Sequence, residues 1–377
     1  MKEKFEMKEA AFNVGNITAL GATIAQIEPT FDQDKFLEQI LPTLCSLELK
    51  ERAILIEDAL IARLPSDYCR SVEILLQALP SEIIDNEVSG YDGFIIMPLT
   101  GYVARLGMDD FVLSMRALHA MTKRFTAEFH IRYFIKSHYE ETMAQLHLWC
   151  EDENVHVRRL VSEGTRPRLP WAFALERFKQ DPTPVIALLT KLKNDKELYV
   201  RRSVANNLND ISKDHPALVV STLQIWKEDS KEMNWLTKHA LRTLLKAGNV
   251  EALALLGYKQ SEALEVVLNV KQSEIMFGES LHFSVEITSK ERSDLPIMID
   301  YVIYYQKANG KLAPKVFKLS TKTLKTGQST TIDKKQKFAD FSTRKHYAGA
   351  QEIAILINGR AYEKVAFTLL PEYHQSL

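Results

Sequence analysis

The chain has 377 residues, of which 46% are hydrophobic and 26% charged, an ordinary composition for a globular protein with room for two domains. No run approaches the roughly 18 apolar residues of a membrane span, and the polar N-terminus MKEKFEMKEA lacks the apolar core of a signal peptide. Its three cysteines lie far apart without metal-ligand spacing, so they predict free thiols in a reducing cytoplasm.

The net charge of −1 conceals an uneven distribution of charge along the chain. Residues 1–154 carry a balance of −11, residues 155–260 a balance of +7, and residues 261–377 a balance of +3. A basic central segment favours a polyanionic partner, although a solvated basic face would give the same count.

Apolar side chains recur at helical spacing through the first part of the chain, which predicts a series of helices. These helices are expected at 32–79, with a break and an N-cap at Pro65-Ser66-Asp67, and at about 102–108, 110–124, 126–136 and 140–151. In the helix expected at 126–136, Thr126 can act as the N-cap. Glu128 then falls in the first turn, where the helix dipole favours a carboxylate.

The stretch from Trp149 to Gly257 repeats itself. Val157-Arg158-Arg159 recurs 43 residues later as Val200-Arg201-Arg202, and a looser third copy carries His239 and Arg242. A period of about 40 residues with two helices per unit is typical of HEAT-type solenoids. Basic residues at one helical position would line up on one face, where they predict contacts to phosphate. Only one arginine of each pair need face that partner, and the other can pair with the neighbouring repeat.

Near residue 263 the helical pattern ends and an alternating pattern begins. A strand pattern at 264–270, strict alternation at 281–287 and further short segments at 297–305, 316–319, 329–332 and 348–357 predict about seven short strands, as in an immunoglobulin-like sandwich. The expected fold is therefore an all-α HEAT-like repeat solenoid followed by a small all-β immunoglobulin-like sandwich. The two predicted domains are residues 1–258 and residues 264–377.

Several enzyme signatures are missing from the sequence: a P-loop, a dinucleotide-binding glycine pattern, a zinc motif and a nucleophile elbow. This leaves either a binding protein or an enzyme that works through carboxylates and electrostatics, without a metal or cofactor. Glu163 follows Arg159 by four residues, so the two can pair on one helix face. A structural ion pair is the alternative interpretation of Glu163, and Asp210 can equally be a residue of a helix end or turn.

At this point the sequence resembles a known family. The motifs VRRLVSEGTRPRLPWA, VRRSVANNLNDISKDHP and KHALRTLLKAGN, with FTAEFHIRYF upstream of them, resemble in order and spacing the AlkC branch of the HEAT-like repeat alkylpurine DNA glycosylases. The resemblance spans roughly residues 1–258, and some members carry a C-terminal immunoglobulin-like domain. One departure is that His130 and Tyr133 stand where the family pattern has a small residue and a proline.

The resemblance implies a monofunctional DNA-3-methyladenine glycosylase, a base-excision repair enzyme. It would hydrolyse the N-glycosidic bond of cationic alkylated bases, 3-methyladenine and 3-methylcytosine, without full base flipping. The expected partner is double-stranded DNA that contains alkylated bases, and the expected protein is a cytoplasmic, nucleoid-associated monomer. The alternative from another class is a non-catalytic HEAT scaffold that binds DNA or protein.

The resemblance also implies functional positions. Glu128, Glu163 and Asp210 would be catalytic, because carboxylates can stabilise a cationic sugar and place the attacking water. The expected DNA-binding residues are Arg158, Arg159, Arg166, Arg168, Trp171, Arg201, Arg202, His239 and Arg242. A tryptophan in a repeat protein is usually a core residue, but Trp171 follows two arginines on a proline-stiffened loop. A pure polyanion binder would gain nothing from carboxylates on its basic face, so the carboxylates distinguish enzyme from scaffold.

Overall fold

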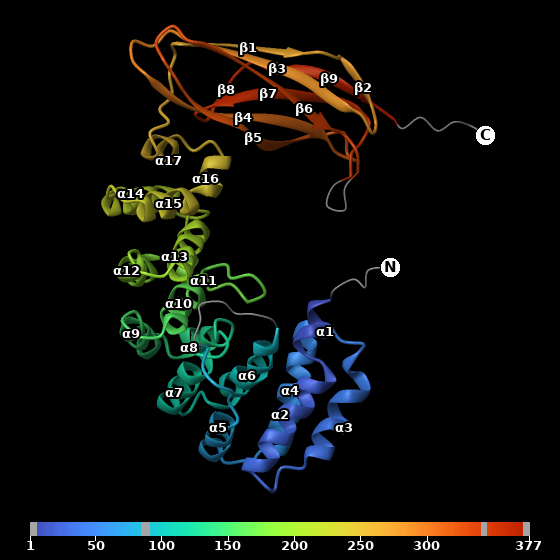
Figure 1. Ribbon diagram of the computed structural model, residues 1–377, viewed down its shortest axis with the longest axis vertical. Helices are drawn as coiled ribbons and strands as arrows, with labels where there is room; N and C mark the ends of the chain where they lie inside the picture. The colour runs from blue at the N-terminus through green and yellow to red at the C-terminus, as the bar shows by residue number, and fades with distance from the viewer. Residues whose placement is uncertain (1–5, 84–90, 341–344, 372–377) are drawn as a thin grey trace, which may run out of the picture. The chain divides into compact units, whose positions relative to one another are not determined.

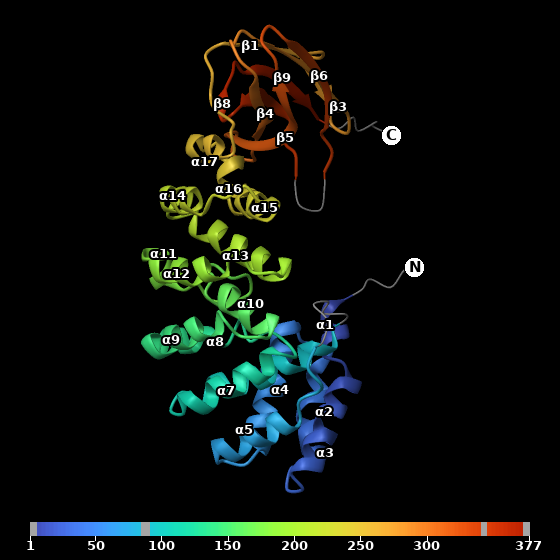
Figure 2. The same ribbon diagram turned by 60° about the vertical axis from the view of Figure 1, so that its left-hand side comes forward.

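The computed structural model describes residues 6–83, 91–340 and 345–371. The chain divides into two compact units. The first holds residues 1–214 and 228–240, and the second holds residues 215–227 and 241–377. Figure 1 and Figure 2 show that the first unit is helical, whereas the second contains the β-sheets.

Short and medium-length helices build the first unit. They are α1 (Met7–Ala11), α2 (Val14–Ile27), α3 (Gln33–Leu44), α4 (Leu49–Arg63), α5 (Tyr68–Gln77), η1 (Asp92–Ile96), α6 (Met97–Leu106), α7 (Phe111–Thr122), α8 (Ile131–Ser137), α9 (Tyr139–Trp149), α10 (Val155–Gly164), α11 (Glu176–Gln180), α12 (Thr183–Leu192), α13 (Leu198–Ile211) and α15 (Lys231–Ala240). The predicted N-cap at Asp67 is confirmed, since its side chain accepts the backbone N–H of Arg70 at 2.7 Å.

The helix expected at 126–136 begins later than predicted, so that prediction was wrong at its N-terminus. Helix α8 starts at Ile131, and Glu128 lies in the turn before it. The hydroxyl of Thr126 accepts the backbone N–H of Glu128 at 3.2 Å, and the carbonyl of Ala127 accepts that of Ile131 at 3.0 Å. Thr126 therefore closes a turn instead of capping a helix. The carboxylate of Glu128 is placed by this turn.

The repeated Val-Arg-Arg motif occupies the same position in two packed helices. Arg158 and Arg159 are the fourth and fifth residues of α10, and Arg201 and Arg202 are the fourth and fifth residues of α13. Helix α10 packs on α13, and α13 packs on α15. The fully buried side chains of this packing include Leu160, Val161, Val204 and Leu208. Each such side chain contributes about 1.5–3 kcal/mol on burial, so the two motifs are held firmly beside each other.

The second unit combines helices with two β-sheets. Its helices are α14 (Pro216–Trp226), α16 (Arg242–Lys246) and α17 (Val250–Leu255). Its strands are β1 (Leu264–Val270), β2 (Glu274–Met276), β3 (Ser280–Ser289), β4 (Leu295–Gln306), β5 (Leu312–Leu324), β6 (Ser329–Lys337), β7 (Gly349–Ile357), β8 (Arg360–Ala361) and β9 (Val365–Leu370). One sheet has the order β1-β3-β6, and the other has the order β2-β9-β7-β4-β5 with β8 paired to β7.

Alternating side chains from both sheets fill one core. Strands β1, β3, β4, β5, β6 and β7 were predicted from the sequence, and β2, β8 and β9 were not. Residues at every second position of β3, such as Phe283, Val285 and Ile287, are buried together with Ile299 and Ile355 of the other sheet. This arrangement of two sheets around a shared apolar core is what the sequence pattern predicted.

A turn between β7 and β8 packs against the segment between α16 and α17. Asn358 and Gly359 have φ values of 48° and 79°, the left-handed pair of a tight hairpin. A Cβ on Gly359 would lie 2.4 Å from the carbonyl oxygen of Gly248, so a side chain there would displace the backbone. The side-chain amide of Asn358 donates to the carbonyls of Lys259 at 2.6 Å and Pro296 at 3.0 Å. These contacts join the last helices to the sandwich.

None of the helices in the described ranges is long and apolar enough to cross a membrane. The described residues also contain no group of three His, Cys, Asp or Glu side chains that could hold a metal ion. The cysteines are free thiols, as predicted, and burial raises the pKa of Cys150 to about 12.

Candidate active site

A buried ion-pair cluster joins the C-terminal part of α10 to the facing side of α13. Ser203, Asn207 and Asp210 recur at spacings of four and three on α13, so they share one face of that helix. Across from them, Glu163 of α10 accepts a hydrogen bond from Arg166 (Nη1 to Oε1, 2.6 Å) and another from Ser203 (Oγ to Oε2, 2.6 Å). The same Arg166 donates from Nε to Oδ2 of Asp210 at 2.8 Å. One guanidinium thus bridges two predicted catalytic carboxylates.

Arg159 connects the third carboxylate to this cluster. Its Nη1 donates to Oε2 of Glu128 and to Oγ1 of Thr126, and its Nη2 lies 3.6 Å from Oε1 of Glu163. The pairing of Arg159 with Glu163 on one helix face is therefore confirmed. The guanidinium also lies 5.2 Å from the ring centre of Tyr199. Glu128, Glu163 and Asp210, which the chain separates widely, meet around two arginines. We call this set, with Arg159 and Arg166, the carboxylate cluster.

The carboxylate cluster is buried, and its three negative charges are balanced by Arg159, Arg166 and the neighbouring Lys213. Burial alone would raise the pKa of Glu163, but the charges of Arg159 and Arg166 and the hydrogen bond from Ser203 hold it below its ordinary value. Asp210 is 2% exposed and accepts a second hydrogen bond from Lys213, Nζ to Oδ1, at 2.8 Å. Glu163 is thus ionised at neutral pH in a site with little water, where electrostatic interactions are strong.

Arg132 of α8 holds the backbone around the carboxylate cluster. It was not among the functional residues predicted from the sequence. Its fully buried guanidinium donates to the carbonyls of Gly164 at 2.9 Å and Arg166 at 2.7 Å, and to that of Phe173. Burial lowers the pKa of Arg132 to about 10, so it stays charged at neutral pH. Nothing in the sequence around Arg132 indicates this role, whereas Lys213 could have been found from its position three residues after Asp210.

The first arginine of each Val-Arg-Arg motif has a structural role. Arg158 donates to two carbonyls of the turn before α10, and Arg201 donates to the two equivalent carbonyls of the turn before α13. Arg158 is buried and also pairs with Asp195, Nε to Oδ2, at 2.6 Å. Such neighbour pairing was one of the expected roles. The geometry of Arg158 and Arg201 gives no support to the phosphate contacts predicted for them.

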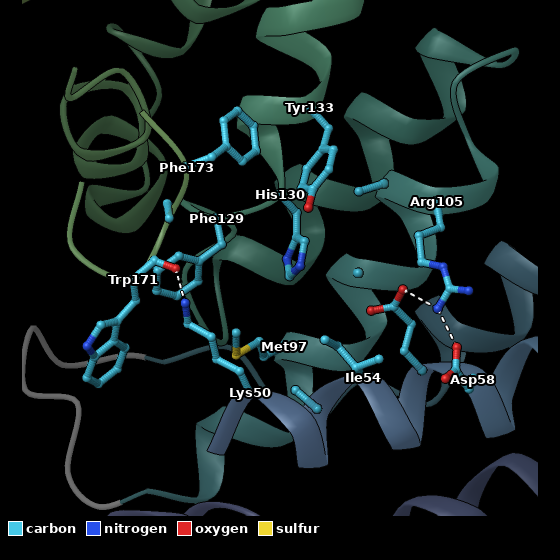
Figure 3. A pocket seen from close by; sticks show the side chains of 15 residues that line it. Lys50, Ile54, Asp58, Met97, Arg105, Phe129, His130, Tyr133, Trp171 and Phe173 are labelled. Carbon is cyan, nitrogen blue, oxygen red and sulfur yellow. Dashed lines mark hydrogen bonds and ion pairs between the residues drawn. The ribbon is translucent and has the colours of Figure 1, made fainter. Parts of the chain in front are cut away.

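Other predicted DNA-binding residues reach the surface of the first unit. Arg202 is exposed on α13 and has no ion-pair partner among the residues that the structure describes. Arg168 is half-buried and forms a two-bond pair with Asp214. Trp171 is 54% exposed, at the tip of the loop after α10, and its φ of 67° is left-handed. Its carbonyl accepts a hydrogen bond from Lys50 of α4, and its indole points away from the neighbouring cavity (Figure 3).

The looser third copy of the repeat is divided between the two units. His239 lies on α15 of the first unit, where its Nε2 is 3.0 Å from Oδ1 of Asn206 and its ring stacks on Trp235. Arg242 is half-buried at the start of α16 in the second unit. The two basic residues of the third copy therefore belong to different compact units, whereas Arg158 and Arg201 lie in the same one.

The chain thus combines helices that carry a buried carboxylate cluster with a C-terminal immunoglobulin-like sandwich, and proteins of this two-part class are known. A protein-family model described as the C-terminal immunoglobulin-like domain of the uncharacterised protein YhaZ matches residues 265–371. The uncharacterized protein YhaZ of Bacillus subtilis (strain 168) is 38% identical over 364 residues, which are 96% of this chain and 99% of that protein.

A solved structure extends the likeness to the whole chain. The alkylpurine DNA glycosylase AlkC of Pseudomonas fluorescens, bound to DNA containing an abasic site analog, is similar with a TM-score of 0.86 and 37% sequence identity. The match covers 97% of this chain and 100% of that one. The chain belongs to the AlkC family of alkylpurine DNA glycosylases, as its motifs predicted.

Proposed function

We propose that this protein is a monofunctional DNA glycosylase that removes cationic alkylated bases, 3-methyladenine and 3-methylcytosine, from double-stranded DNA. The observation that carries the proposal is the carboxylate cluster, built into a chain of the AlkC family. The relative of known structure is bound to DNA containing an abasic site analog. An abasic site is what a nucleotide becomes when its base is removed, so that ligand fits the proposed product.

The chemistry of a cationic base explains why carboxylates suffice. When the bond between C1′ and the base nitrogen breaks, its electron pair stays with the base and cancels the positive charge, so no strong acid is needed. The sugar becomes an oxocarbenium-like cation, which a water then attacks at C1′. Buried carboxylates stabilise that developing charge, because they are fixed in place and poorly screened.

The three carboxylates differ in what their oxygens are free to do. Both oxygens of Glu163 accept hydrogen bonds, from Arg166 and Ser203, and both oxygens of Asp210 accept them, from Arg166 and Lys213. Glu128 uses only Oε2 in this way, and its Oε1 has no partner among the described residues. We assign to Oε1 of Glu128 the placing of the attacking water and the acceptance of its proton. Glu163 and Asp210 supply negative charge and hold the arginines.

The remaining parts of the proposal concern DNA and the helical scaffold. We propose that α9–α10 and α12–α13 are HEAT-like repeats, supported by the equivalent backbone contacts of Arg158 and Arg201. Arg202 and Trp171 are the surface residues best placed to meet a duplex, and the protein would act as a monomer. Neither Glu163 nor Asp210 lines the cavity beside the Trp171 loop. A base therefore stays in or near the duplex until its bond breaks.

The experiment is a base-release assay on methylated duplex DNA with matched variants. Asp210→Asn keeps the shape of the side chain but leaves Arg166 and Lys213 with excess positive charge beside a developing cation. We expect it to bind DNA like the wild type and to release 3-methyladenine at least 100-fold more slowly. Arg116→Ala, a change on the exposed face of α7, is the control. If the wild type binds methylated DNA tightly and releases no base, the non-catalytic scaffold is correct.

A further inference from the structure

A cavity of about 540 Å³ lies in the first unit between α4, α6, the turn before α8 and the Trp171 loop. Figure 3 shows the rings of Phe129, His130 and Tyr133 along one side of it, with Arg105 across from Phe129. The ring planes of His130 and Tyr133 are only 16° apart, and Phe173 meets Tyr133 edge-on with ring centres 5.1 Å apart. The volume and the aromatic walls of the cavity suit a small flat ring.

The hydrogen bonds of His130 define what its ring offers to the cavity. Thr100 donates its single hydroxyl proton to the carbonyl of Met97, at 2.8 Å. With that proton on the Met97 carbonyl, the contact of 2.7 Å between Thr100 Oγ1 and His130 Nδ1 uses the proton of Nδ1. Burial lowers the pKa of His130 to about 4, so the ring is neutral at neutral pH. Nε2 is then a bare acceptor, and it has no partner among the described residues.

A second acceptor lies close to the first. Glu57 of α4 is 6% exposed and pairs through Oε1 with Arg105, at 2.9 Å. Its Oε2 has no hydrogen-bond partner in the described part of the chain. A Cβ built on Gly101 would lie 2.1 Å from that oxygen and 3.4 Å from Nε2 of His130. The glycine lets the carboxylate approach, and the two acceptors converge on one corner of the cavity.

We propose that this cavity binds a nucleobase that carries an exocyclic amine. An amine on a flat ring has two N–H donors, which match the oxygen of Glu57 and the nitrogen of His130, while the ring lies among Phe129, Tyr133 and Phe173. A nucleobase with a carbonyl or methyl at that position would leave two buried acceptors without a partner, which costs binding energy.

The cavity is placed to receive the base that the proposed reaction frees, and this identification of the occupant rests on the proposed function. The turn that carries Glu128 continues directly into Phe129 and His130. The loop that carries Arg166 continues into Trp171 and Phe173, which also line the cavity. The freed base leaves with the electron pair of the broken bond and so loses its cationic charge. It then suits an aromatic cavity, and 3-methyladenine keeps its exocyclic amine.

The test measures binding of free bases to the whole protein by calorimetry, without DNA. The probes are 3-methyladenine, adenine and 6-methylpurine, which has the shape of adenine but a methyl in place of the amine. We expect saturable binding of the first two and at least tenfold weaker binding of 6-methylpurine. Equal affinity for adenine and 6-methylpurine, or no binding of 3-methyladenine, overturns the proposal.

Two variants locate the binding in this cavity. In Glu57→Gln, the amide oxygen keeps the contact with Arg105, so the NH₂ group faces the amine of the base. A donor then meets a donor, and binding of 3-methyladenine should fall at least tenfold. Tyr133→Ala removes one aromatic wall of the cavity, and the same loss of binding is expected. Because the Tyr133 side chain is 45% exposed, the fold is little affected. Leu148→Ala, at a position 70% exposed on α9, is the control. Unchanged affinity in both Glu57→Gln and Tyr133→Ala refutes the site.

The outcomes for the site and for the enzyme can be told apart. Binding of free base is measured without DNA, whereas glycosylase activity is measured by release from methylated duplex. A protein that releases 3-methyladenine but binds none of it contradicts the cavity proposal alone. A protein that binds the free base but releases none contradicts the proposed function, and leaves the cavity a site for amine-bearing nucleobases.

Discussion

Arg166 is the residue whose removal should damage the carboxylate cluster most. Its guanidinium is the only group in the described cluster that contacts both Glu163, at 2.6 Å, and Asp210, at 2.8 Å. Arg166→Met keeps most of the side-chain length and removes the charge. Glu163 would then rely on Arg159 at 3.6 Å and on Ser203.

The size of the effect follows from burial. A hydrogen bond to a charged group contributes about 1.5–3 kcal/mol, and removal of one partner from a buried ion pair costs about 3–5 kcal/mol. We expect Arg166→Met to lower the free energy of unfolding by about 3–5 kcal/mol, a large part of the roughly 5–15 kcal/mol typical of a folded domain. Arg166→Lys should cost about half as much, because one ammonium group reaches one carboxylate at a time.

Urea denaturation followed by helix circular dichroism measures the total effect, and amide hydrogen exchange of α10 and α13 measures it where it arises. The double variant Arg166→Met, Glu163→Gln tests the cause. Removing the charge of Glu163 should restore at least about 1 kcal/mol of the loss, as expected for groups in direct contact. If Arg166→Met stays within about 1 kcal/mol of the wild type, or if the two changes are additive, the bridging role is wrong.

Arg202→Ala should weaken binding to damaged and undamaged duplex equally and reduce the slope of log affinity against log salt by about one; the Arg116→Ala control should not, and an unchanged slope would remove Arg202 from the DNA face. The pKa of Glu163 is lowered in the folded protein, so its stabilisation is complete above the unfolded value of about 4.3 and is lost as pH falls below it. Acid denaturation of Glu163→Gln should accordingly be less steep than that of the wild type, and identical profiles would contradict this. Trp171→Gly relieves a left-handed backbone that costs a bulky residue about 1 kcal/mol, so stability should hold or rise while base release falls. Full base release by that variant would show that the indole is not used.

The sequence was most informative where contacts are local. Strand β1 was predicted at its observed ends, because a half-buried strand shows a period of two. Strands β2 and β8 have three and two residues, which is too short for any period to appear. The pairing of Arg159 with Glu163 was likewise available from helix geometry, since the two residues are four apart.

Contacts across the helices could not be predicted in the same way. The bonds from Arg159 to Glu128 and from Arg166 to Asp210 join residues 31 and 44 positions apart, and they depend on how α8, α10 and α13 pack. The choice of the first arginine in each pair as the structural one depends on backbone carbonyls, whose direction no residue pattern reveals. The family resemblance supplied the positions of the carboxylates, but not which oxygen of each is occupied.

The contact of Gly359 with Gly248 has a consequence for the history and engineering of such chains. The β7–β8 turn fits against the backbone between α16 and α17. The boundary between the last helix and the first strand is therefore not a boundary between compact units. A recombination event that exchanged the sandwich between relatives would have to carry those helices with it, or would break a fit that tolerates no side chain. An exchanged segment would therefore have to begin among the helices, near residue 215, because α14 belongs to the same compact unit as the sandwich.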